Sequence, residues 1–439
     1  MAARPLRIGI FGAYGTRNLG NEATLAAIIQ GFRRVRPDSE FRAFVLDPTA
    51  VEAREQIRCF PLFPGDASGR TGSAVASADA AGSPLIGFAQ LRDTVRRIPG
   101  ARAGVRGARR AILALGELAF LVECRRRLAG LDLLLTGGLG TISDSYGGAW
   151  YHPWNTFRWV TLARSLGIPV AFASVGTASL QSPWATRLAR AAMVRASHVS
   201  ARDRRSQDVL AALAPNLRPK LCPDLVLGFE ADIDPAPRCE PQTVGVVPAP
   251  HRDERYYGTG DRAAYNRYVM RMAAFVVRLV SEGYRVAFIP TQTRADPLVI
   301  DDIRAAIDGT SPESWRRAEL VCPIRTLPDA DRAFVAMDFV ISSRLHGTVL
   351  PLRLGIPVVA VFEEVKTRDL MDALGLGEYV LDARTFEPEV LHGVFSRLVA
   401  NAPAVRDRIR SGVAQARAQI DAQYRELVEL AEARARQTG

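Results

Sequence analysis

The stretch between Phe339 and Lys366 holds the side chains best suited to chemistry. It opens with a short apolar run, Phe339–Ser342, which is typical of a buried strand. The run leads directly into Ser343, Arg344, Leu345, His346 and Gly347. Polar residues at a strand-to-helix turn lie at the ligand-binding edge of a parallel sheet, where the N–H groups of the helix that follows attract anions. There an arginine can hold a carboxylate or phosphate, and a histidine can move a proton near neutral pH.

Lysine is almost absent from this chain, which makes each remaining lysine informative. Of the 57 Lys and Arg residues, only Lys220 and Lys366 are lysines. Lys366 follows a second strand-like run, Val358–Phe362, whereas Lys220 has no such setting and is interpreted as structural. A purely electrostatic site in this chain would hold Arg, which cannot lose its proton, so we expect Lys366 to transfer protons. The alternative is a surface lysine after an edge turn.

The elements that position these groups follow the rhythm of α/β domains. Leu6–Phe11 predicts a buried strand, and the glycines after it lead into a helical pattern from Glu22 to Val35. Other apolar runs with little polar alternation predict further buried parallel strands. These runs are Leu131–Thr136, Val170–Ser174, His198–Ala201, Val244–Val247, Val286–Ile289, Leu320–Cys322 and Val358–Phe362.

Length and local composition predict how these units are grouped. A chain of 439 residues is expected to form two domains. The segment Ala231–Pro241, rich in proline and acidic residues, is interpreted as the linker. We therefore predict an N-terminal domain over 1–232, a second domain over 242–400 and a C-terminal helix over 401–439. The expected fold is α/β, with two doubly wound, Rossmann-like domains in a glycosyltransferase-B-like arrangement and the ligand between them.

The composition excludes several classes of protein. Apolar residues make up 48% and charged residues 23%, as in ordinary globular proteins, and no apolar run is long enough to span a membrane. The chain carries neither a signal peptide nor a metal-type pair of cysteines, so we expect a cytoplasmic protein without a metal site. The net charge of +11 is spread along the chain, and no nucleic-acid-binding motif is present. Nucleic acid is therefore not an expected partner.

A basic insertion over about residues 65–110 interrupts the α/β rhythm. Residues 66–84 are rich in Gly, Ala and Ser and predict a flexible loop. Seven arginines lie between Arg92 and Arg110. Such a stretch can lie on anionic lipid at the inner face of a membrane, which would make the protein peripheral. The other interpretation, a solvated insertion, is the one that we favour.

Several of these motifs together resemble the polysaccharide pyruvyl transferase family. The most specific is Ser342–Gly347, and the similarity extends over about residues 6–380. At position 21 this chain has Asn where Asp is commoner in the family. The other similar segments are the opening turn Gly12–Ala23, the second glycine turn Leu131–Gly140, the arginine segment Ala201–Ser206 and Pro223–Leu225.

The resemblance implies a reaction and roles for particular residues. Members of the family transfer the enolpyruvyl carbons of phosphoenolpyruvate onto two hydroxyls of a sugar, which forms a pyruvate ketal without a metal or redox cofactor. His346 and Lys366 would then be the catalytic proton-transfer groups, in an order that stays open. The implied donor-binding residues are Arg202, Ser343, Arg344, Leu345 and Gly347. The implied acceptor-binding residues are Asn18, Glu22 and Gly138, although Asn18 and Glu22 would equally suit a helix cap.

Two other functions remain compatible with the sequence. The first is a nucleotide-sugar glycosyltransferase or epimerase of the same architecture. The second is a non-catalytic family member that binds a polymer or a partner enzyme. The expected partners in the leading interpretation are a small-molecule donor and a sugar or lipid-linked oligosaccharide acceptor. The acceptor sugar, the ketal stereochemistry and the oligomeric state are not specified by the sequence.

Overall fold

The computed structural model describes most of the chain. The described residues are 4–16, 18–64, 101–140, 142–145, 147–177, 180–231, 233, 243–257, 260–311, 313, 318–320, 324, 326–363 and 365–438, with only the backbone for 101–114, 318–320 and 365. The predicted loop over 66–84, the arginines from Arg92 to Arg97 and most of the predicted linker lie outside these residues.

The first domain is built on a parallel sheet that begins with the predicted strand near the N-terminus. Its strand order is β3 (Arg58–Pro61), β2 (Glu40–Val45), β1 (Arg7–Phe11), β4 (Leu133–Gly137), β5 (Val170–Val175), β6 (His198–Ala201) and β7 (Lys220–Leu221). Its helices are α1 (Leu19–Val35), α2 (Pro48–Glu55), α4 (Ala101–Leu128), α5 (His152–Ser165), α6 (Pro183–Met193) and α7 (Arg204–Leu213), with the 3₁₀ turns η2 (Gly148–Trp150) and η3 (Leu225–Gly228). The central strands are almost wholly apolar because helices cover both faces of the sheet.

The second domain repeats this plan, and neighbouring strands again pair in parallel. Its strand order is β10 (Ala318–Leu320), β9 (Arg285–Phe288), β8 (Thr243–Val247), β11 (Phe339–Ser342), β12 (Val358–Phe362) and β13 (Val380–Asp382). Its helices are α8 (Glu254–Tyr257), α9 (Arg262–Ser281), α10 (Asp296–Asp308), α12 (Leu327–Val335), α13 (Leu345–Arg353), α14 (Val365–Ala373) and α15 (Pro388–Ala400), with the 3₁₀ turn η4 (Gly377–Tyr379). The predicted fold class, two doubly wound α/β units, is confirmed.

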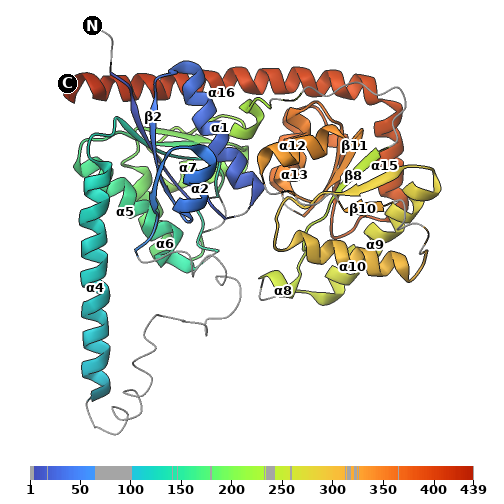
Figure 1. The fold of residues 1–439 in the computed structure, drawn as a ribbon, viewed down its shortest axis with the longest axis horizontal. Coiled ribbons are helices and arrows are strands. Elements are labelled where there is room, and N and C mark those ends of the chain that lie inside the picture. Colours follow the sequence, from blue (N-terminus) through green and yellow to red (C-terminus); the bar gives the residue numbers. More distant parts are fainter. Residues whose placement is uncertain are drawn as a thin grey trace.

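The predicted C-terminal helix is present as α16 (Ala402–Thr438), and it runs along both domains (Figure 1). The ring of Tyr424 packs edge-on against Phe32 of α1 at a centroid distance of 5.3 Å, and its hydroxyl donates to the carbonyl of Ala27 over 3.1 Å. Nearer its start, Ile409 is buried in the same continuous apolar core as the second sheet. Because one helix contributes to both domains, it limits how far they can move apart.

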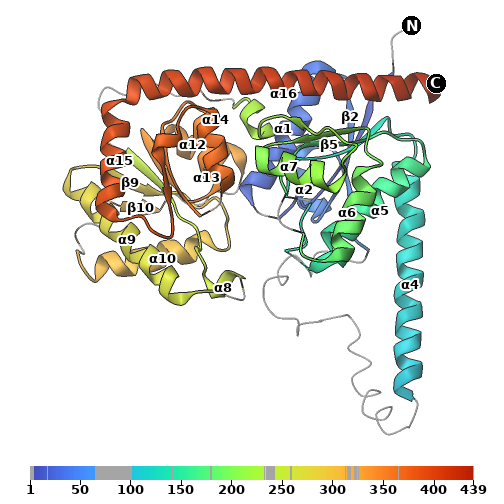
Figure 2. The same cartoon turned by 180° about the vertical axis from the view of Figure 1, so that it is seen from behind.

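Helix α4 includes part of the predicted basic insertion. The last part of the basic segment, residues 101–110, forms the first turns of this helix. Figures 1 and 2 show that the N-terminal half of α4 extends well beyond the rest of the first domain, on the side opposite α16.

Candidate functional site

The carboxyl ends of both sheets meet at a cavity of about 910 Å³ between the domains. Five of the predicted site residues line this cavity. Asn18 comes from the first domain, and Ser343, Arg344, Leu345 and His346 come from the second. Strand β11 ends at Ser342 and α13 begins at Leu345, so these side chains lie at the strand-to-helix turn, as predicted. The domains touch here through backbone, because the N–H of Leu19 donates to the carbonyl of Thr291 over 3.2 Å.

Arg344 is held by a buried aspartate of the same domain. Its Nε lies 3.0 Å from Oδ1 of Asp296, which is fully buried at the start of α10. The other oxygen of Asp296 accepts from the backbone N–H groups of Thr291 and Gln292 over 2.9 and 2.7 Å. Burial opposes the charge of Arg344, but the attraction of Asp296 outweighs it and raises the pKa of Arg344. The guanidinium is therefore fixed in position and stays charged.

The helix that Arg344 precedes has no side-chain cap, because a guanidinium has no acceptor for helix N–H groups. Arg344 is the N-cap residue of α13, and its side chain makes no capping hydrogen bond there. The first N–H groups of a helix have no partner within the helix, and together they favour an anion. The cavity thus combines a fixed guanidinium with a helix N-terminus, which suits a phosphate or carboxylate.

His346 is largely buried at the contact between the two domains. Its Nδ1 faces the first turn of α1, where a Cβ on Gly20 would lie only 2.0 Å away, so that glycine is required for the contact. Its Nε2 lies 3.9 Å from Oδ2 of Asp224 and, among the described residues, accepts or donates no hydrogen bond. Burial lowers the pKa of His346; Asp224 opposes this lowering and Arg202 adds to it. His346 is therefore neutral near pH 7, with one nitrogen available to take up a proton.

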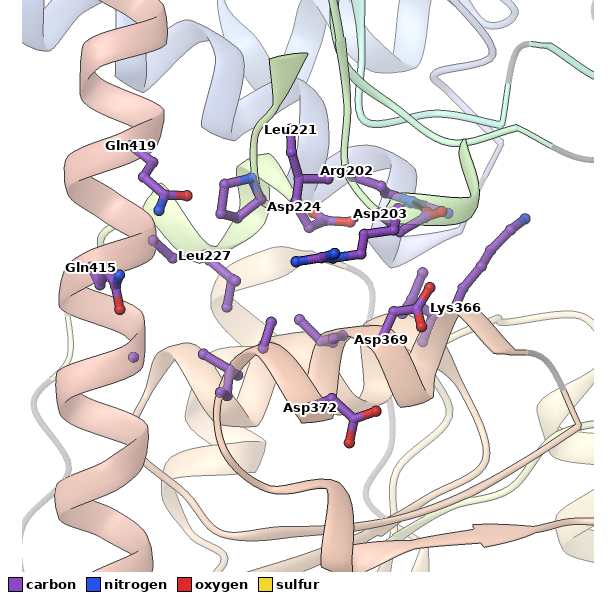
Figure 3. Close-up of a pocket in the computed structure, with 18 residues that line it drawn as sticks. Arg202, Asp203, Leu221, Asp224, Leu227, Lys366, Asp369, Asp372, Gln415 and Gln419 are labelled. Atoms are coloured by element: carbon purple, nitrogen blue, oxygen red, sulfur yellow. Dashed lines mark hydrogen bonds and ion pairs between the residues drawn. The ribbon is translucent and has the colours of Figure 1, made fainter. Parts of the chain in front are cut away.

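Arg202 and Lys366 line a second, smaller cavity of about 480 Å³ that adjoins the first, and Leu345 contributes to both walls (Figure 3). The Nη1 atom of Arg202 donates to Oδ2 of Asp224 over 3.2 Å and to the carbonyl of Gly138 over 3.1 Å. Asp224 therefore lies between Arg202 on one side and His346 on the other. Figure 3 shows Lys366 on α14, extended toward the first domain. The structure thus divides the predicted site residues between two neighbouring cavities.

The three predicted acceptor residues have different surroundings. Asn18 lines the larger cavity and also caps α1 by accepting from the N–H of Gly20 over 3.0 Å. Glu22 is buried, accepts from the N–H groups of Gly15 and Thr16 over 3.0 Å each, and forms an ion pair with Arg54. Gly138, at a φ of +61°, offers its carbonyl to Arg202. Glu22 and Gly138 thus shape the site from inside the first domain.

Gly347 is buried behind the turn and makes the close packing of α13 possible. A Cβ at this position would lie 2.6 Å from Val247 of β8. Ser343 is also largely buried, and its Oγ accepts from the hydroxyl of Tyr268 over 2.9 Å. Both residues therefore hold the turn that presents Arg344 and His346.

The family model for polysaccharide pyruvyl transferase matches residues 18–361. The chain belongs to this family. The match includes Asn18, Arg202, Arg344 and His346, and it ends before Lys366. The resemblance drawn from the sequence motifs is thereby confirmed.

Solved structures of similar shape include two UDP-GlcNAc 2-epimerases and a glycotransferase. The UDP-GlcNAc 2-epimerase of Neisseria meningitidis, bound to UDP-GlcNAc, has a TM-score of 0.53 at 12% identity and covers 97% of this chain and 98% of its own. The UDP-GlcNAc 2-epimerase of Methanocaldococcus jannaschii has a TM-score of 0.53 at 8% identity, with 89% and 92% covered. The glycotransferase of kitacinnamycin has a TM-score of 0.51 at 14% identity, with 97% and 99% covered. At these identities the likeness establishes the fold, and it confirms the glycosyltransferase-B-like arrangement for this pyruvyl transferase family member.

The structure adds site residues that the sequence motifs did not single out. They are Asp224, Arg205, Asp296 and His251, of which Arg205 and His251 line the larger cavity. The signal for Asp296 was an aspartate before proline at the start of the helix that follows β9. Arg205 lay within the quoted arginine segment, but the sequence could not tell which arginine faces the larger cavity.

Metal-binding clusters and membrane-spanning helices are both absent from the described residues. They contain no cluster of three or more His, Cys, Asp or Glu side chains arranged to hold a metal ion. Within the same residues, no helix combines the length and apolarity that crossing a membrane requires.

Proposed function

We propose that this protein transfers a pyruvyl group from phosphoenolpyruvate to two hydroxyls of a sugar and forms a pyruvate ketal during the synthesis of a cell-surface polysaccharide. The observation that carries the proposal is the larger cavity, where the fixed Arg344, the uncapped start of α13 and the neutral His346 face the same space. Membership of the family supports the same reaction.

The two anionic groups of the donor would bind to cationic groups in both cavities. Its phosphate would bind at the N-terminus of α13, with Arg344 and Arg205 beside it. Arg202, at the boundary of the smaller cavity, would attract the carboxylate. The acceptor would enter from the side of Asn18 in the first domain, so that its hydroxyls approach His346.

The reaction requires two protons to be taken from the sugar hydroxyls and two to be given, one to carbon 3 of the enol and one to the departing phosphate. Protonation of carbon 3 of the enol makes carbon 2 electrophilic, and a sugar hydroxyl attacks it while losing its proton. The C–O bond to phosphate then breaks, and the second hydroxyl closes the ketal and loses its own proton. The products are one ketal and one inorganic phosphate for each phosphoenolpyruvate.

The two proton-transfer roles follow from charge. His346 is neutral at rest because burial lowers its pKa, so it would act as the base that takes the hydroxyl proton. Asp224 would stabilise the imidazolium that forms. Lys366, as an ordinarily protonated group in the adjoining cavity, would supply the proton to carbon 3.

The test supplies the purified protein with phosphoenolpyruvate labelled in its carbons and a panel of sugar acceptors. We expect label in the sugar and release of phosphate only when an acceptor is present. His346→Ala should abolish both, whereas His392→Ala, a histidine of α15 outside both cavities, should not. Consumption of a nucleotide sugar with no use of phosphoenolpyruvate would instead support the glycosyltransferase or epimerase alternative.

A further inference from the structure

Aromatic side chains gather on the surface of the first domain where η2, α5 and α6 meet. The ring of Trp150 lies 5.8 Å from that of Trp154 and 6.4 Å from that of Trp184, and Phe157 lies 5.9 Å from Trp154. We name these four residues the aromatic patch. Trp150 is 65% exposed and Trp184 is 57% exposed. Large aromatic residues are usually covered, so a contiguous exposed group marks an interaction surface.

Arginines lie around this patch, and the stretch of chain that forms it contains no acidic residue. No aspartate or glutamate occurs in the sequence between Asp144 and Asp203. Two exposed arginines of this segment stack on the patch: Arg187 lies 5.1 Å from the Trp184 ring and Arg195 lies 5.9 Å from the Phe157 ring. The exposed Arg190 belongs to the same helix as Arg187. The surface is thus both aromatic and positively charged.

Two acidic residues that contact the segments forming the patch have partners of their own. The carboxylate of Asp144 accepts from the N–H groups of Gln181 and Ser182 over 2.9 and 2.7 Å. On α4, Glu117 forms an ion pair with Arg158 over 2.7 Å. The charge of Glu117 is therefore balanced by Arg158 and not by an arginine of α6.

The aromatic patch lies on the same side of the molecule as the loop that lines the larger cavity. Trp150 and Trp184 follow the carboxyl ends of β4 and β5, which is the edge that faces ligands in such sheets. The loop after α8 lines the larger cavity, and α8 and α6 both lie on the side opposite α16 (Figures 1 and 2). Helix α4 extends on this same side, with Leu115 and Leu118 exposed by 66% and 57%.

We propose that the aromatic patch and the arginines around it dock the protein onto an anionic lipid bilayer. Tryptophan prefers the interface between lipid and water, and arginine is attracted by anionic headgroups. Association with a second copy through this face would bring like charges together, so a bilayer is the better match. Docking follows from this surface alone. Its use in reaching a lipid-linked acceptor rests on the proposed function.

The test measures binding to vesicles of phosphatidylcholine with and without phosphatidylglycerol. We expect binding that needs phosphatidylglycerol, and quenching of tryptophan emission by brominated lipid. Trp150→Ser/Trp184→Ser should abolish the quenching. The matched control, Met270→Ser/Val390→Ser, removes two side chains that are each 51% exposed on the second domain and should change nothing.

A second pair of variants separates the patch from net charge. Arg187→Glu/Arg190→Glu should weaken binding by about 30-fold or more, from the usual contribution of a basic residue near such a surface. Arg262→Glu/Arg267→Glu on α9 changes the net charge equally and should leave binding within a few fold. Equal weakening by both pairs would show attraction by net charge only, and would overturn the proposal.

Two further measurements complete the test. The proposal would also be overturned if the tryptophan variant still bound vesicles, or if it lost self-association and kept vesicle binding. The tryptophan variant should keep full turnover with a water-soluble acceptor and lose it with an acceptor embedded in vesicles. If the protein binds vesicles but never consumes phosphoenolpyruvate, the proposed function fails and the docking surface stands.

Discussion

Replacing Arg344 by alanine should harm the protein in two separable ways. Asp296 is fully buried, and its partner contacts it through Nε at 3.0 Å. Removing one member of a buried ion pair leaves an unpaired charge and costs about 3–5 kcal/mol of folding free energy. The same change removes a charge-assisted contact to the donor, which we expect to weaken phosphoenolpyruvate binding by about 2 kcal/mol, roughly 30-fold.

The double variant Arg344→Ala/Asp296→Asn distinguishes the two effects. Without the buried charge, much of the lost stability should return in urea unfolding, because the amide still accepts from the N–H groups of Thr291 and Gln292. Calorimetry should show that donor affinity stays as low as in the single variant. Recovery of donor binding in the double variant, or no recovery of stability, would refute this account of Arg344.

The pH dependence of the single variant gives a further check. Burial already raises the pKa of Asp296 against the attraction of Arg344, and without Arg344 the pKa should rise further. A group with a raised pKa in the folded state stabilises the protein at low pH and loses that contribution as the pH rises. Arg344→Ala should therefore be nearer to the parent in stability at pH 5 than at pH 8. An equal difference at both values would show that the carboxyl stays ionised.

Three more predictions follow from the neighbouring residues. Asp224→Asn removes the charge that opposes the lowering of the His346 pKa, so the acidic limb of the pH–rate profile should move to lower pH. Turnover should fall by roughly 100-fold, and an unchanged acidic limb would show that Asp224 does not act on His346. Lys366→Arg should leave donor affinity nearly intact and lower turnover at saturating substrates by roughly 100-fold; turnover within a few fold of the parent would make this residue a charge only. Gln423→Leu on α16 should cost about 2 kcal/mol or more in urea unfolding, because its amide bonds buried serine hydroxyls of β5 and β6, whereas the exposed Gln415→Leu should change little.

Local pattern was sufficient for the fold and for the position of the central turn. The strands β6, β11 and β12 have the predicted bounds, since short apolar runs between glycine turns and helical patterns have few other solutions in a parallel sheet. The turn from Ser343 to Gly347 was located because a polar motif directly follows a buried strand. Arg344 and His346 lie in this one turn, so the sequence alone could place them together at the ligand-binding edge of the sheet.

Side-chain direction and domain contact were decided only by the tertiary structure. Arg202 was expected at the donor site, and the structure places it on the wall of the neighbouring cavity with its side chain turned toward Asp224. Asp296 becomes the partner of Arg344 although 48 positions separate them, and no local pattern encodes such a pair. The burial of His346 against Gly20 depends on how the two domains meet, and this packing lowers the pKa of His346. The sequence determined which chemical groups reach the edge of each sheet, while the closure of the domains determined which of those groups are paired, buried or left facing a ligand.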